Sequence, residues 1–377
     1  MNKKYIIIAC YLTFNVLIAY SQTKPETKGV KKWWNSLVHG NIDRTFEKKI
    51  DMSYIVAPCY TYEGSFGIGG AATGLYRLDR TDSIMQPSDI SLSGSAQVKG
   101  FYGITVKGNN NFKGNKSRLS YILQFQNKNL DFWGVSYDAC NQNPISGYKR
   151  QMIKWQSDYI YKLTPNIHLG AALNLNYTKA SDIVNPIYLE GQKASYFFTG
   201  IGLSVSYDTR DFILNPKQGI YFMLKETYYP RFMSTYDKDI FGTTVVFDAY
   251  QKAWKGSVFA FDLYGQFNGK NIPWTLREEV GSGTSRMRGY YEGRYMDSNQ
   301  IFAQMELRQH IYSRIGCVAW VGGGTVFPSF DKLRMQNILQ NYGLGLRVEF
   351  KHNVNIRIDY GFGKETAGFV FQFAEAF

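Results

Sequence analysis

The feature that most constrains this chain is a two-residue hydrophobic repeat that begins near Met52 and continues to Phe377. Between residues 167 and 178, for example, every second residue is apolar and most of the residues between them are polar or small. Because successive side chains of a β-strand point to opposite faces, such a segment has one apolar face and one polar face. The repeat therefore predicts an all-β fold.

Sixteen runs of this kind follow one another along the chain. From the sixth run onward, short connections mostly alternate with longer ones, which is typical of the periplasmic turns and external loops of outer-membrane barrels. Closed bacterial barrels also have an even number of strands. We therefore predict a 16-stranded antiparallel transmembrane β-barrel. The runs cover residues 52–60, 66–77, 89–98, 101–111, 117–126, 149–161, 167–178, 194–208, 219–230, 242–253, 256–268, 298–310, 315–327, 338–350, 353–361 and 367–377.

Two other fold classes compete with the barrel. A helical membrane protein is excluded, because no stretch after residue 21 approaches the roughly 20 apolar residues of a spanning helix. A soluble sandwich would bring all the apolar faces together in one dry core. The polar faces of the last runs carry Arg347, Glu349, Arg357 and Asp359, and such charged residues fit the wet lumen of a barrel better.

The N-terminal residues predict export from the cytoplasm. Lys3 and Lys4 precede an apolar run that ends in Ala19-Tyr20-Ser21, with small residues at the two positions that signal peptidase reads. Residues 1–21 are therefore predicted to be a signal peptide, and residues 51–377 to be the barrel domain. Between them lies the basic segment 22–50, which we predict to contain a short periplasmic helix. The apolar residues that share one face of this helix are Val30, Trp33, Trp34, Leu37 and Val38.

The charge pattern limits the predicted partners. The formal net charge is +13, but the Lys and Arg residues are scattered, with no run longer than two. We therefore predict no nucleic-acid partner and favour contact with acidic lipid surfaces or a charged lumen. The predicted partners are outer-membrane lipids, together with other outer-membrane or periplasmic proteins that contact residues 22–50.

Residues with catalytic or metal-binding potential are isolated from one another in the sequence. The cysteines after residue 21 form no CxxC pair and no Cys/His cluster, and no serine lies in a recognisable nucleophile context. We therefore predict no enzymatic activity, no metal site and no cofactor. The four histidines, each well separated from the others, are His39, His168, His310 and His352.

The longest segment without the repeat, Gly269 to Asp297, carries a family resemblance. It contains Arg288-Gly289-Tyr290, which resembles the (V/I)-R-G-(F/Y) signature of the BamA/TamA family of outer-membrane barrels, also called the bacterial surface antigen family. The tripeptide lies between the eleventh and twelfth runs, where that family has its sixth external loop. The segment from Asn299 to Arg308 resembles the family's next strand. The likeness extends over residues 52–377.

The resemblance implies a structural role for these residues. In the family this loop folds back into the lumen, and its arginine pairs with acidic residues of the inner wall. Arg288 is therefore expected to meet Glu306, which the two-residue repeat places on the inner face. This chain has Gly322 where the family has a second acidic residue, and we expect Asp359 or Glu349 to replace it.

The resemblance also implies a function. The seam between the first strand (Met52 to Tyr60) and the last strand is expected to open sideways. The function predicted first is therefore outer-membrane protein assembly, protein translocation or lipid handling through this seam. The family's insertases carry POTRA modules before the barrel, and residues 22–50 are too few for one. The aromatic residues expected to form the C-terminal signal for assembly are Phe369, Phe371, Phe373 and Phe377.

Two alternative functions follow from the residues. The chain could be a structural barrel that docks a partner through residues 22–50. It could also be a pore that favours anions, because Arg308, Arg347 and Arg357 are predicted to face the lumen. The loop that contains Arg288 would narrow such a pore.

Overall fold

The computed structural model describes residues 44–61, 64–269, 272–281, 286–351, 354–373 and 375–377. The predicted signal peptide lies outside these residues, as does the predicted helix between residues 30 and 38. Neither prediction is tested. None of the helices in the described part of the chain is both long and apolar enough to cross a membrane.

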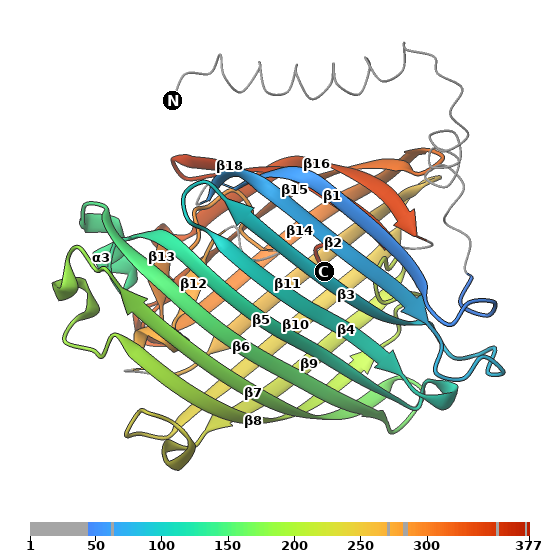
Figure 1. Cartoon of the computed structure of the whole chain (residues 1–377), viewed down its shortest axis with the longest axis horizontal. Coiled ribbons are helices and arrows are strands. Elements are labelled where there is room, and N and C mark those ends of the chain that lie inside the picture. Colours follow the sequence, from blue (N-terminus) through green and yellow to red (C-terminus); the bar gives the residue numbers. More distant parts are fainter. Residues whose placement is uncertain (1–43, 62–63, 270–271, 282–285, 352–353, 374) are drawn as a thin grey trace, which may run out of the picture. The chain divides into compact units, whose positions relative to one another are not determined.

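The described chain forms one large antiparallel sheet, in which each strand pairs with its neighbours in sequence order (Figure 1). The all-β prediction is therefore confirmed. The sixteen strands of this sheet are β1 (Asp51–Thr61), β2 (Ser65–Tyr76), β3 (Ser88–Gln97), β4 (Tyr102–Asn111), β5 (Ser117–Phe132), β6 (Ser146–Lys162), β7 (Ile167–Ser181), β8 (Ser195–Asp208), β9 (Gly219–Tyr229), β10 (Ile240–Lys252), β11 (Ser257–Phe267), β14 (Asn299–Tyr312), β15 (Ile315–Phe327), β16 (Leu339–Lys351), β17 (Val354–Gly363) and β18 (Thr366–Phe373).

The elements outside this sheet are short and lie in the connections. A two-stranded hairpin, β12 (Glu278–Val280) with β13 (Tyr295–Asp297), lies between β11 and β14. Sequence periodicity did not predict this hairpin, because three residues are too few to show a repeat. The helical elements are η1 (Lys113–Asn115), α3 (Tyr137–Gln142), η2 (Pro186–Leu189), η3 (Arg231–Met233), η4 (Trp274–Leu276), η5 (Phe330–Lys332) and η6 (Met335–Asn337).

The two faces of the sheet differ as the repeat predicts. On β7, Ile167, Leu169 and Leu173 are exposed on the outer face, whereas Asn174 and Thr178 are buried on the inner face. Large apolar side chains that remain exposed along a whole strand are typical of a surface that meets lipid. The inner face therefore borders a polar lumen.

The two ends of the sheet also differ. The three longest connections, residues 133–145, 182–194 and 268–298, lie at one end, which we call the loop end. The short connections between β6 and β7 and between β14 and β15 lie at the other end, which we call the turn end. The predicted external loops correspond to the loop end.

At the loop end the polarity of the two faces is reversed. The inner face of β5 is polar at Gln124 and Gln126 but apolar and buried at Leu130 and Phe132, while Asn129 is exposed on the outer face. A strand that continues beyond the lipid has water outside and packed loops inside, so its apolar face turns inward. This explains why the fifth predicted run stopped at residue 126, although β5 continues to residue 132.

The inward-facing apolar residues at the loop end form one buried cluster, which we call the cap cluster. Its members come from the strand ends and from the long connections, so it packs the loops onto the wall. They are Leu130, Phe132, Trp133, Val135, Tyr137, Cys140, Tyr148, Ala180, Leu189, Tyr196, Phe198, Ile240, Ile272, Trp274, Val280, Met287, Tyr290, Tyr291, Tyr295, Met296, Phe302, Val326 and Leu339.

The first and last strands lie beside each other but are not paired. In the described residues β1 has a hydrogen-bonded register only with β2, and β18 only with β17. The predicted full closure of the barrel is therefore not observed. Two features disfavour pairing along this edge: Pro58 of β1 has no N–H to donate, and β18 ends at Phe373. The prediction that the last strand continues to Phe377 is wrong.

Candidate functional site

The connection between β11 and β14, residues 268–298, enters the lumen and contacts opposite parts of the wall. We call it the lumen loop. Its hairpin β12/β13 packs into the cap cluster through Val280 and Tyr295. The predicted motif Arg288-Gly289-Tyr290 lies between these two strands. The lumen loop is thus the only described connection that has a sheet of its own.

The Arg288 side chain is completely buried against the inner wall. One terminal nitrogen lies 2.6 Å from Glu306 Oε1 on β14, and the other lies 2.7 Å from Asp359 Oδ2 on β17. The guanidinium also lies 3.7 Å from the ring centre of Trp320 on β15. We call Arg288, Glu306 and Asp359 the tip anchor. Two carboxylates and an aromatic face satisfy the buried charge, as burial of an arginine requires.

The backbone of the motif lies directly against β17. Gly289 has φ +100°, and a Cβ atom at this position would lie 2.3 Å from the carbonyl oxygen of Gly361. Any larger residue would push the loop from the wall. Tyr290 completes the contact, because its hydroxyl donates to the carbonyl oxygen of Gln340 at 2.7 Å and accepts from the amide of Lys364 at 2.8 Å.

The two expected substitutes for the family's second acidic residue lie in different places. Asp359 contacts Arg288, whereas Glu349 lies near Arg314 at the turn end. The structure also explains Gly322. A Cβ atom there would lie 2.6 Å from the carbonyl oxygen of Ala303, so the wall has no space for an aspartate at this position.

A second arginine of the lumen loop also contacts the wall, and sequence reasoning did not single it out. Arg286 makes three hydrogen bonds to Asp262 of β11, at 2.5, 2.8 and 3.1 Å, and its guanidinium lies 4.2 Å from the ring centre of Tyr264. Asp262 is the direct cross-strand neighbour of Asp248. Arg286 therefore supplies a positive charge where the wall places two acidic residues opposite each other.

The opposite side of the lumen loop carries acidic residues that bind basic residues of β5 and β6. Glu292 contacts both Lys128 and Arg150, and Glu279 lies 2.8 Å from Arg150. We call Glu279, Glu292, Lys128 and Arg150 the cross-lumen anchor. Burial raises the pKa of Glu292, but Lys128 and Arg150 outweigh it and hold that pKa at about 2.

Further contacts join the lumen loop to the neighbouring loops. Arg294 donates to the carbonyl oxygen of Cys140, and Arg277 donates to that of Val135. The Trp274 indole N–H donates to the carbonyl oxygen of Lys193 at 3.0 Å. These bonds and the cap cluster connect the lumen loop to the connections β5–β6 and β7–β8.

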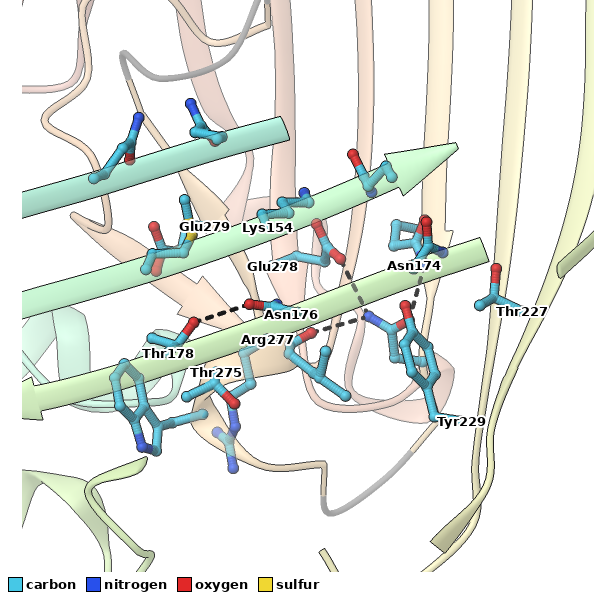
Figure 2. A pocket seen from close by; sticks show the side chains of 18 of the residues that line it. Lys154, Asn174, Asn176, Thr178, Thr227, Tyr229, Thr275, Arg277, Glu278 and Glu279 are labelled. Atoms are coloured by element: carbon cyan, nitrogen blue, oxygen red, sulfur yellow. Dashed lines mark hydrogen bonds between the residues drawn. The ribbon is translucent and has the colours of Figure 1, made fainter. Parts of the chain in front are cut away.

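Between the lumen loop and the wall lies a polar cavity of about 400 Å³ (Figure 2). Asn174 and Asn176 of β7 line it together with Lys154 of β6 and Glu278 of the loop. Burial raises the pKa of Glu278 to about 7, although the hydrogen bond from Asn268 and the charge of Lys154 act in the opposite direction. The lumen beneath the cap cluster is therefore hydrophilic. In the described residues no group of His, Cys, Asp and Glu side chains could hold a metal ion.

The predicted seam residues lie in several environments. On β1, Met52 is exposed on the outer face, while the side chain of Tyr60 lies outside the described residues. On β18, Phe369 packs against Tyr360 of β17, with ring centres 4.5 Å apart. The side chains of Phe371 and Phe373 also lie outside the described residues. Phe377 is not on the seam: it packs in the lumen against Tyr250 of β10.

Comparison with known protein families identifies one match. The Omp85 superfamily domain matches residues 90–377 of the chain. No curated protein sequence matches it.

Solved structures with similar folds are outer-membrane proteins. BamA from Haemophilus ducreyi lacking POTRA domains 1–3 is 12% identical, with a TM-score of 0.54 over 86% of this chain and 70% of that one. CdiB from Acinetobacter baumannii is 11% identical, with a TM-score of 0.52 over 87% and 66%. CdiB from Escherichia coli is 11% identical, with a TM-score of 0.58 over 87% and 62%. The chain thus spans only about two thirds of the length of the CdiB structures.

Proposed function

The chain belongs to the Omp85 superfamily of the bacterial outer membrane, and from this membership we propose that it assembles or secretes proteins through the seam between β1 and β18. Protein strands would pass sideways between the lumen and the bilayer. In a second version of the mechanism, lipid would take the same path. POTRA modules are absent from the described residues.

One observation carries this proposal: β1 and β18 are neighbours without a shared register. An unpaired strand edge presents a row of N–H and C=O groups that another strand can pair with. In a bilayer such groups need partners, because lipid tails offer no hydrogen bonds. An incoming strand would supply those bonds at this edge.

The loop end supports a sideways route over a route straight through. The cap cluster and the lumen loop pack across the loop end of the barrel, and the loop is attached to both sides of the wall. A client that entered from the turn end would meet these buried contacts. Separating β1 from β18 breaks no described backbone ladder, so the seam is the easier path.

The test is photo-crosslinking from β1 in the native host. A crosslinking residue replaces Met52, Tyr54 or Val56 in turn, because all three side chains are exposed on the outer face. Matched controls at Leu169 and Leu173 of β7 face outward far from the seam in strand order. Adducts with other exported proteins from β1 but not from β7 support the proposal. Adducts only with lipid and with β18 exclude protein clients and leave lipid handling.

The pore alternative loses its main support, because the arginines that suggested anion selectivity have partners. Arg308 lies 2.9 Å from Glu306, and Arg347 lies 2.5 Å from Asp359. Arginines in ion pairs attract few anions into a lumen. Single-channel conductance in planar bilayers tests this alternative directly, and we expect no large open state.

Partner docking is a second candidate, because the start of the described chain is held firmly at the turn end. Arg77, the residue after β2, donates to Thr45 at 2.8 Å, and its guanidinium lies 3.9 Å from the ring centre of Phe46. A segment that precedes these residues would begin next to the seam strand β1. Deletion of residues 22–43 leaves this contact intact, so loss of a co-purifying protein on deletion would support docking.

A further inference from the structure

After β18 the chain turns into the lumen instead of continuing along the seam. The segment Glu375–Phe377, which we call the tail, packs at the turn end of the inner wall. The Phe377 ring lies 6.2 Å from the ring of Tyr250 and 5.0 Å from the guanidinium of Arg308, measured between centres. Tyr250, with Val258 and Ala260, forms a small buried apolar cluster separate from the cap cluster.

The Glu375 carboxylate has a binding site of its own, in which its side chain is only 2% exposed. Arg347 lies 2.8 Å from one carboxylate oxygen, and Asn355 donates to the other at 2.6 Å. Arg308 lies 3.8 Å away and also donates to the carbonyl oxygen of Phe377 at 3.2 Å. Carboxylate and aromatic ring are thus both held by groups that the wall supplies.

This carboxylate completes a closed ring of alternating charges. Each neighbouring pair in the ring lies within 4 Å, and all six side chains are at most 8% exposed. In order around the ring the residues are Arg288, Glu306, Arg308, Glu375, Arg347 and Asp359. Glu375 therefore lies opposite Arg288, linked to it on both sides through one acidic and one basic residue of the wall.

The arrangement couples the tail to the tip anchor. With Glu375 in place, the three arginines of the ring face three carboxylates, and a fourth arginine, Arg357, lies 3.5 Å from Asp359 outside the ring. Without it, Arg308 and Arg347 each lose an acidic partner and compete with Arg288 for Glu306 and Asp359. At short range and low dielectric this competition weakens the bonds that hold the lumen loop.

We propose that the turn end of the lumen is a docking site for a peptide segment with a carboxylate two residues before an aromatic ring, and that the tail is its resident ligand. The docked tail positions Arg308 and Arg347 so that the tip anchor stays closed. Because the tail follows the seam strand β18, withdrawal of β18 empties the site and loosens the lumen loop. The coupling between the tail and the lumen loop does not depend on which protein or lipid the barrel handles.

The test compares Glu375→Gln with a matched control, Glu47→Gln, at an exposed position before β1 and away from the loop end. Hydrogen exchange of the full chain is measured in detergent or nanodiscs for peptides that cover residues 287–297. We expect roughly tenfold faster exchange in Glu375→Gln and no change in the control. Unchanged exchange in Glu375→Gln would overturn the coupling.

A second comparison separates coupling from general loosening. In an Arg288→Ala background the tip anchor is already open, so Glu375→Gln should add no further exchange in residues 287–297. Additive effects of the two substitutions would mean that the tail acts elsewhere. If Glu375→Gln does not fold, Phe377→Ala removes the ring contact but keeps the carboxylate. It should give a smaller increase in the same peptides, and no increase would overturn the proposal.

Discussion

The two anchors of the lumen loop use opposite charges. In the tip anchor the loop supplies the cation, Arg288, and the wall supplies the carboxylates. In the cross-lumen anchor the loop supplies the carboxylates and the wall supplies Lys128 and Arg150. With this reversal the loop fits in one orientation only, because a rotation across the lumen would bring like charges together. The difference indicates that electrostatic specificity, as well as apolar packing, sets the position of the loop.

The two anchors also differ in exposure. Every side chain of the tip anchor is fully buried, whereas Glu279 in the cross-lumen anchor is 23% exposed. Buried ion pairs are little screened by salt and costly to break, while partly exposed pairs are weaker and screened. We therefore expect a hierarchy in which the tip anchor dominates.

Breaking the tip anchor should have the largest effect. Arg288→Ala leaves Glu306 and Asp359 without their shared cation, which we expect to cost about 3–5 kcal/mol locally. Protease cleavage within residues 281–295 should increase, while the barrel still shows the faster mobility of a folded barrel on unheated SDS gels. Equal protection of the loop in the variant and the parent would show that the tip anchor does not hold it.

Breaking the cross-lumen anchor should have a smaller effect. Glu292→Gln removes one carboxylate from between Lys128 and Arg150, but Glu279 still binds Arg150. We expect a cost of about 1–3 kcal/mol, with partial release of the loop in the same proteolysis assay. Added salt should reduce the difference in loop cleavage between the variant and the parent. Glu47→Gln, at an exposed position before β1, serves as the control. A loss as large as that of Arg288→Ala would contradict the hierarchy.

A pH titration should reveal an effect that builds up gradually and is small per pH unit. The pKa of Glu278 is raised to about 7, so the folded loop binds this proton more tightly than an unfolded loop does. The stability of the folded loop should therefore fall by about 1 kcal/mol per pH unit as pH rises from the ordinary carboxyl range toward 7. Glu278→Gln should remove this slope, measured by hydrogen exchange of residues 287–297. An unchanged slope in Glu278→Gln would mean that other titratable groups cause the pH dependence.

Glu292 serves as a control in which the pH dependence of loop stability has the opposite sign. Its pKa is lowered to about 2, so its contribution is present above the ordinary carboxyl range and is lost as pH falls toward 2. Glu292→Gln should therefore remove the pH dependence of the acid limb only, in addition to the loss of loop stability that it causes at higher pH. Together, Glu278→Gln and Glu292→Gln show which carboxyl group lowers the stability of the loop as pH rises toward 7 and which lowers it as pH falls toward 2.

Much of the tip anchor could be predicted from the sequence, because it depends on parity along regular strands. Glu306 and Asp359 belong to runs whose inner and outer residues alternate clearly, so their orientation follows from their position in the strand. The contact of Asp359 with Arg288 depends on the distance between β14 and β17 around the lumen. The sequence alone did not show whether Asp359 or Glu349 contacts Arg288.

The cross-lumen anchor could not be predicted in the same way. Lys128 lies beyond the point where the faces of β5 reverse, so the repeat no longer indicates which side faces lipid. The pairing of Glu292 with two strands more than a hundred residues earlier depends on the path of an irregular loop. No local pattern encodes that path.

The tail did carry a signal in the sequence. If β18 continued with the same parity beyond Phe373, Glu375 would be on the same face as Phe369, which is the outer face. A charged residue there is costly in lipid, so the strand was bound to end or turn inward before residue 375. Aromatic residues on both sides of Glu375 hid this conflict, because they continue the expected repeat.

The reversal of faces at the loop end also sets the bilayer that this protein fits. On β7 the outer face is apolar from Ile167 to Tyr177 and basic at Lys179, so eleven residues cross the lipid. The ten steps between the first and the last of them span about 33 Å along a strand, or about 23 Å across a membrane at a tilt near 45°. That thickness corresponds to short acyl chains. In lipids with longer chains, the polar outer residues of β5 and β7 would enter hydrocarbon, and the resulting mismatch would bend the bilayer around this side of the barrel.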